Sequence, residues 1–161
     1  MKTENKPTGF TLSMALMDTL PVLFFSVSIG VLSARFGSAL FLAGAILVIL
    51  AGIMKVLWKF LLATVKRDVR IFNRQMRFIM PAGFALMIAA LIADRDKWSI
   101  QDVAAHAFSL PSLIFFILAL TGIGCMSYFA RHFNQMVVKS NWIEQGTNVL
   151  AQFFFMMGVL I

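Results

Sequence analysis

The sequence predicts an all-α protein, a polytopic bundle of about five membrane-spanning helices. Of its 161 residues, 60% are hydrophobic and 13% are charged, whereas a soluble domain has roughly 45–50% apolar and about 25% charged residues. Uncharged runs such as residues 39–54 and 78–93 approach the roughly 17–25 apolar residues that a helix needs to cross a bilayer. Because a soluble fold of this size would have to bury every such run in one small core, we expect lipid to surround the chain.

Five apolar spans form one transmembrane domain over residues 1–161, at residues 12–34, 38–59, 77–93, 107–130 and 146–161. The first span is longer than the apolar core of a signal peptide, roughly 7–15 residues, and it carries Asp18, so we interpret it as a retained span. Cleavage after Ser33-Ala34 is the alternative. The last span has no polar residue after it, which leaves open whether the chain is complete at Ile161.

The distribution of basic residues predicts the orientation of these spans. Lysine and arginine accumulate over residues 55–77, between the second and third spans, beside a single acid, Asp68. Such an excess is typical of a cytoplasmic segment. The N-terminus is then cytoplasmic, the loop with Asp94, Asp96 and Asp102 is outside, and the C-terminus is outside. We expect this N-in/C-out protein in the inner (plasma) membrane of a bacterium.

The basic segment contains neither glycine nor proline, so we predict that the second helix continues through it beyond the hydrocarbon region. Five of its residues are candidate contacts for anionic lipid headgroups or for the rim of a cavity: Lys55, Lys59, Arg67, Arg70 and Arg74. Ordinary snorkelling and a topogenic charge cluster are the alternative. The net charge of +7 is concentrated between apolar spans, and we predict no nucleic-acid partner.

Small residues on two spans predict close contacts between helices, within one subunit or between copies in a homo-oligomer. On the second span these are Gly44 and Gly52. On the third span they are Ala85, Ala89 and Ala93, which recur at intervals of four and therefore share one helix face.

Polar residues form a stripe on each of the last two spans. On the fourth, the intervals are four, three, four, three and four, and the residues are Thr121, Cys125, Tyr128, His132, Gln135 and Lys139. Leading into the fifth, the intervals are four, three and four, and the residues are Asn141, Gln145, Asn148 and Gln152. Such spacing places each set on one face of a helix. Both stripes begin at the predicted cytoplasmic surface.

Asp18 adds a carboxylate near the cytoplasmic end of the first span. A charge at depth costs several kcal/mol unless it faces water, a partner or a proton, and Arg131, His132 or a lysine near the end of the second span could pair with it. We hypothesise a cytoplasm-facing cavity with Lys55 and Lys59 near its mouth. Its candidate substrate- or proton-pathway residues are Asp18, Cys125, Tyr128, His132, Asn148 and Gln152. The alternative is that these groups form interhelical hydrogen bonds or lie at the headgroup boundary.

The sequence contains no recognisable catalytic motif, and we predict no cofactor and no metal site. There is one cysteine, Cys125, and His106 is expected near the face opposite His132. A transport-type protein, either a carrier or a channel subunit, is therefore the first hypothesis. The second is an anchor or assembly subunit that binds partner membrane helices. The third, an enzyme acting on a lipid-like substrate through Cys125, Tyr128 and His132, lacks the carboxylates or metal ligands that we would expect.

Overall fold

The computed structural model describes residues 11–65, 69–133 and 138–161, and these residues form helices and connecting turns without a strand. The helices are α1 (Leu12–Met17), α2 (Thr19–Phe36), α3 (Ala39–Thr64), α4 (Arg70–Arg74), α5 (Met76–Ala93), the 3-10 turn η1 (Arg95–Lys97), α6 (Ile100–Phe108), α7 (Ser112–His132) and α8 (Val138–Leu160). The predicted all-helical bundle is confirmed for this part of the chain.

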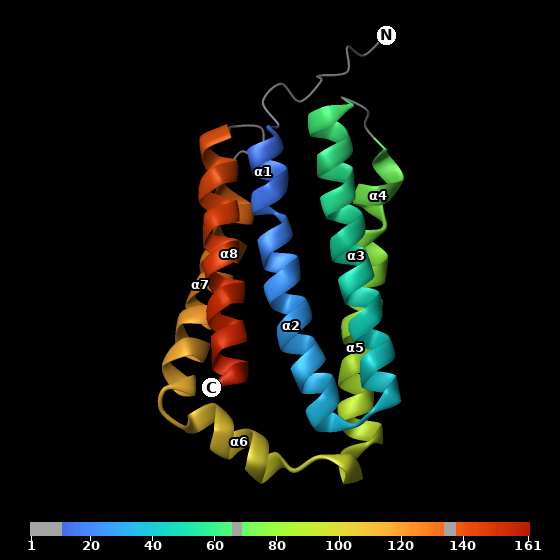
Figure 1. Cartoon of the computed structure of the whole chain (residues 1–161), viewed down its shortest axis with the longest axis vertical. Coiled ribbons are helices and arrows are strands. Elements are labelled where there is room, and N and C mark those ends of the chain that lie inside the picture. The colour runs from blue at the N-terminus through green and yellow to red at the C-terminus, as the bar shows by residue number, and fades with distance from the viewer. Residues whose placement is uncertain (1–10, 66–68, 134–137) are drawn as a thin grey trace.

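Two antiparallel hairpins lie on either side of α2 (Figure 1). One consists of α3 and α5 and the other of α7 and α8, while α2 contacts both α3 and α8. The short helix α6 crosses the end of the bundle that is far from the N-terminus. The first and last described helices therefore pack together, and α2 connects the two halves of the bundle.

Four helical stretches in the described residues are long and apolar enough to cross a membrane: Leu12–Phe36, Ala39–Thr64, Met76–Ala93 and Ser112–Phe129. The predicted count of five is corrected to four by this criterion. The fifth long helix, α8, does exist, but it begins at Val138 instead of residue 146. Its first half carries charged and amide side chains, including Lys139, Glu144 and Gln145, and this lowers its hydropathy.

The second helix continues past the predicted end of its span at residue 59, as expected, but only to Thr64 and not through residue 77. Helix α3 ends at Thr64, and α4 and α5 run back beside α3. The Gln75 side chain joins these segments, because its Nε2 atom donates to the carbonyl of Ala51 at 3.1 Å and to the carbonyl of Phe72 at 3.1 Å. Packing against α3 therefore outweighs the local helix propensity of the connecting residues.

Glycines allow the closest contacts of α3. A Cβ atom on Gly44 would lie 2.7 Å from the carbonyl oxygen of Gly83 and 2.9 Å from the amide nitrogen of Met87. A Cβ atom on Gly52 would lie 3.2 Å from a methyl group of Val22. Gly44 thus sets the distance between α3 and α5, and Gly52 lies at the contact between α3 and α2.

The small-residue face predicted on the third span does not form the contact between α5 and α3 within this chain. Ala85, Ala89 and Ala93 are exposed on α5, while Gly83 and Ala90 are buried toward α3. The expected interval of four is present, but an adjacent face of the helix makes the contact. The alanine face is left on the outside of the bundle.

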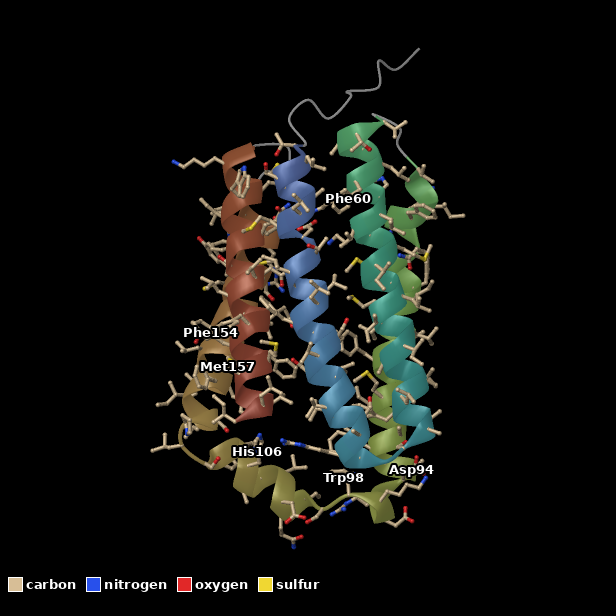
Figure 2. All side chains as sticks on the ribbon, viewed as in Figure 1. Phe60, Asp94, Trp98, His106, Phe154 and Met157 are labelled. Atoms are coloured by element: carbon tan, nitrogen blue, oxygen red, sulfur yellow. The ribbon has the colours of Figure 1, made fainter. Side chains whose placement is uncertain are left out.

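The segment around α6 is attached to the bundle at both ends (Figure 2). At one end, Ser38 caps α3 by accepting from the Phe41 amide at 3.0 Å, and its hydroxyl donates to Asp94 at 2.5 Å. At the other, the Nε2 atom of His106 forms a hydrogen bond of 3.0 Å with the carbonyl of Gly158 in α8. These contacts hold the segment across the predicted outer end of the helices.

Candidate functional site

A break in the first span positions Asp18. This residue ends α1 and precedes α2, and its amide donates to the carbonyl of Met14 at 3.1 Å. Three residues later, the buried Pro21 has no amide hydrogen, so it cannot donate to the carbonyl of Met17 as the next helical turn requires. The regular helical hydrogen bonding is therefore interrupted between α1 and α2, and the Asp18 carboxylate lies against Lys59 of α3.

Asp18 forms an ion pair with Lys59 of α3. Their side chains are 11% and 9% exposed, so the pair is shielded from the surroundings. A lysine near the end of the second span was one of the three partners considered from the sequence, and the structure selects Lys59. Because its ammonium group is buried against Asp18, Lys59 does not lie at an exposed rim or contact lipid headgroups.

Gln145 of α8 is the third member of this cluster and is only 4% exposed. With its amide oriented to satisfy both neighbours, its nitrogen donates to the carbonyl of Met14 at 3.2 Å, and its oxygen accepts from Lys59 at 3.0 Å. Sequence reasoning placed Gln145 in the polar stripe but did not select it as a site residue. Its position one turn before Asn148 was the signal that could have identified it.

A cavity of about 290 Å³ adjoins the ion pair and is lined by residues from all five long helices. Its polar lining residues are Asp18, Lys55, Asn148 and Gln152. Valine, isoleucine, methionine and phenylalanine side chains make up most of the remaining wall. The structure therefore brings together three of the six predicted pathway residues, together with the predicted rim residue Lys55.

Two polar groups in this wall lack partners among the described residues. The Oε1 atom of Gln152 is buried and accepts no hydrogen bond. No carboxylate in the described part of the chain lies within ion-pair distance of Lys55, which is half-buried. A polar ligand or water in the cavity could satisfy both groups.

The other predicted pathway residues lie elsewhere on α7. Tyr128 is 56% exposed, and its ring stacks on that of the exposed His132 with centroids 4.1 Å apart. The half-buried Cys125 is not part of the cavity lining, which on α7 consists of Met126. The stripe on this helix therefore faces largely away from the cavity.

The remaining predicted basic contacts are only partly described. Arg74 is exposed on α4, where it would be accessible to headgroups. Arg67 lies outside the described residues, and the side chain of Arg70 is likewise not described.

A second cavity, of about 580 Å³, lies beside α6 at the other end of the bundle. Its charged lining residues Arg35, Asp96, Lys97 and Asp102 are exposed. Its histidine, His106, is engaged with the Gly158 carbonyl. The smaller cavity is the better candidate site because its charged and amide side chains are half-buried instead of exposed, and two of them lack partners among the described residues.

The described residues contain no group of three or more His, Cys, Asp or Glu side chains suited to holding a metal ion. The site therefore consists of an ion pair, three amide side chains, one additional lysine and an apolar wall. Comparisons with protein-family models, with curated proteins and with solved structures gave no match to this chain.

Proposed function

We propose that this chain is a transport-type membrane protein, a carrier or a subunit of one, that moves a small solute through the cavity between its helices. The main support for this proposal is the Asp18–Lys59 ion pair, which lies beside a cavity lined by all five long helices. Ionisable groups within membrane helices are costly, and they commonly mark ion or substrate pathways.

The depth of the cluster supports access from one side of the membrane. With a rise of about 1.5 Å per residue, Lys59 lies about 8 Å from the end of α3, and the 26 residues of α3 extend about 39 Å. Since the hydrocarbon core is about 30 Å thick, the pair would lie just inside its boundary. On the positive-inside rule this is the cytoplasmic side, and the membrane that we propose is the inner (plasma) membrane of a bacterium.

The ion pair is suited to couple proton binding to helix movement. It connects the α1–α2 break to α3, and Gln145 extends the connection to α8. Protonation of Asp18 removes its charge and weakens its attraction for Lys59. The positive charge of Lys55 still repels that lysine, and the negative charge of Glu144 still attracts it. Because α2 contacts both halves of the bundle, its displacement would alter the cavity.

A flux assay in proteoliposomes tests the proposal. Vesicles containing a lumenal pH indicator would be exposed to a panel of neutral amino acids, monocarboxylates and organic cations. We expect solute-dependent proton movement with the wild-type chain and its loss in Asp18→Asn. It should persist in the control Asp96→Asn, which removes an exposed carboxylate at the other end of the bundle. Equal flux in Asp18→Asn and wild type would contradict the role of the ion pair.

An assembly subunit is the second candidate function, favoured by one observation. Ala85, Ala89 and Ala93 form an exposed small-residue face on α5, and such faces allow a partner helix to approach closely. The native mass of the protein extracted from its own membrane separates the two functions. A stoichiometric unrelated chain would favour the subunit, whereas the chain alone or a homo-oligomer would favour the carrier.

A further inference from the structure

The cavity beside the Asp18–Lys59 pair has a polar part and an apolar part in its lining. Asp18, Lys55, Asn148 and Gln152 provide its charged and amide groups. Asp18 is already paired with Lys59, whereas Lys55 has no carboxylate partner among the described residues. Glu144 acts on Lys59 but is not part of the lining. The uncompensated charge that faces the cavity is therefore positive.

The apolar part of the lining is adaptable in shape. Phe25 of α2 and Phe84 of α5 pack edge to face, with centroids 6.2 Å apart. Met76, Met80 and Met126 supply flexible, polarisable side chains from α5 and α7. A flexible hydrocarbon chain fits such a wall better than a rigid polar solute does.

Gln152 provides a second, independent indication of a ligand. Its buried oxygen lacks a hydrogen-bond partner in the described part of the chain, and an unsatisfied buried polar atom is costly. Rotation of the Gln152 side-chain amide exchanges the positions of its oxygen and its nitrogen. In the orientation described, the unpaired oxygen can accept from the protonated form of an acidic ligand, and after rotation of the amide Gln152 can donate to the anion.

The volume limits the size of the ligand. At about 290 Å³, the cavity lies near the lower limit of the roughly 300–1,000 Å³ found for small-molecule sites. From charge, polarity and size together we infer that the ligand is a small amphipathic organic anion, a carboxylate with an apolar tail of medium length such as octanoate. This inference rests on the proposed function, because it names the class of solute that the carrier would bind.

Photolabelling in lipid nanodiscs tests the inference. The full chain would be placed in zwitterionic lipid, labelled with an octanoate analogue that carries a diazirine on its tail, and mapped by mass spectrometry. We expect labelling of α5 and α7 near Met80 and Met126 that octanoate prevents. Octylamine, which has a cationic head, and acetate, which has no tail, should compete at least about tenfold more weakly.

Matched variants identify the group that binds the anion. Lys55→Gln should weaken octanoate competition by about tenfold, and Lys55→Arg should retain it. Lys139→Gln, which removes an exposed positive charge near the start of α8, should leave it unchanged. Gln152→Leu provides a second cavity variant with the same expected weakening. Equal effects of Lys55→Gln and Lys139→Gln, or equal competition by octylamine and octanoate, would overturn the inference.

Three further outcomes separate related explanations. If nanodiscs containing anionic phosphatidylglycerol abolish the competed labelling, the cavity binds a lipid headgroup and the free solute is excluded. If octanoate binds but no solute in the panel drives proton flux, the proposed function fails and the ligand assignment stands. If another solute drives flux and octanoate neither binds nor competes, only the ligand assignment fails.

Discussion

Removing one member of the Asp18–Lys59 pair should destabilise the bundle far more than removing both. In Asp18→Asn, the Lys59 ammonium stays buried with Gln145 as its remaining close partner. Breaking a buried ion pair in this way costs about 3–5 kcal/mol. Because Gln145 still accepts a hydrogen bond from the Lys59 ammonium, we expect the lower end, about 3 kcal/mol, and a similar loss for Lys59→Met.

The double variant Asp18→Asn/Lys59→Met leaves no buried charge in the pair, so we expect it to lose only about 1–2 kcal/mol. The two single losses would add to about 6 kcal/mol, so the positions should show strong coupling. For a chain of this size, 1 kcal/mol corresponds to about 2–4 °C in melting temperature. Each single variant should therefore melt about 6–12 °C below wild type, and the double variant should melt above both.

Thermal melts of the purified variants in one detergent, followed by gel filtration of the folded fraction, measure these differences. Lys97→Met is a suitable control because it breaks the exposed pair of Lys97 with Asp94, and exposed pairs contribute little. A double variant whose loss equals the sum of the two single losses would refute the reasoning, since it would show that the two side chains do not stabilise each other.

Two further predictions concern the ends and contacts of the helices. Gly44→Ala should destabilise the α3–α5 contact, since overpacking costs about 1–3 kcal/mol. Gly30→Ala is the control, because a Cβ atom at this position meets nothing within 4 Å. It should raise the free energy of unfolding by about 0.5–1 kcal/mol in the same melts. Equal stability of the two variants would contradict the close contact of α3 with α5 at Gly44. The hydrogen bond from Ser38, followed by the interactions with Lys97, lowers the pKa of Asp94 below its ordinary value. Asp94 should therefore stabilise the protein above that value and lose this contribution as the pH falls through its lowered pKa. Melts at a series of pH values should show the gap between wild type and Asp94→Asn closing in acid, and a gap that widens there would contradict the assignment.

Length and hydropathy were sufficient to predict the long helices. The runs over residues 39–54 and 78–93 lie within α3 and α5, because an uncharged run of that length has few alternatives to a spanning helix. Local signals were insufficient where packing decides the structure. Nothing between Lys55 and Arg77 marks a turn by composition, yet Gln75 and its neighbours pack back on α3.

The site was only partly predictable for a related reason. Periodicity identifies residues that share a helix face, but it does not determine which neighbour that face meets. The stripe of α8 faces the bundle, so Asn148 and Gln152 line the cavity. The stripe of α7 faces outward at Tyr128 and His132, whose rings stack on each other. The pairing of Asp18 with Lys59 depends on how α1 and α2 pack against α3, which a linear pattern does not indicate.

The position of α2 also has a consequence for how the chain is made. One side of α2 packs on α3, which the ribosome produces immediately afterwards, but the other packs on α8, where Phe153 meets Phe24 with centroids 5.6 Å apart. That second side therefore stays uncovered until α8 has been synthesised. Asp18 and Lys59 can meet as soon as α3 is made, while Gln145 joins their cluster only once α8 has been inserted. During synthesis, α2 is therefore packed on one side only for as long as α5 and α7 are being made.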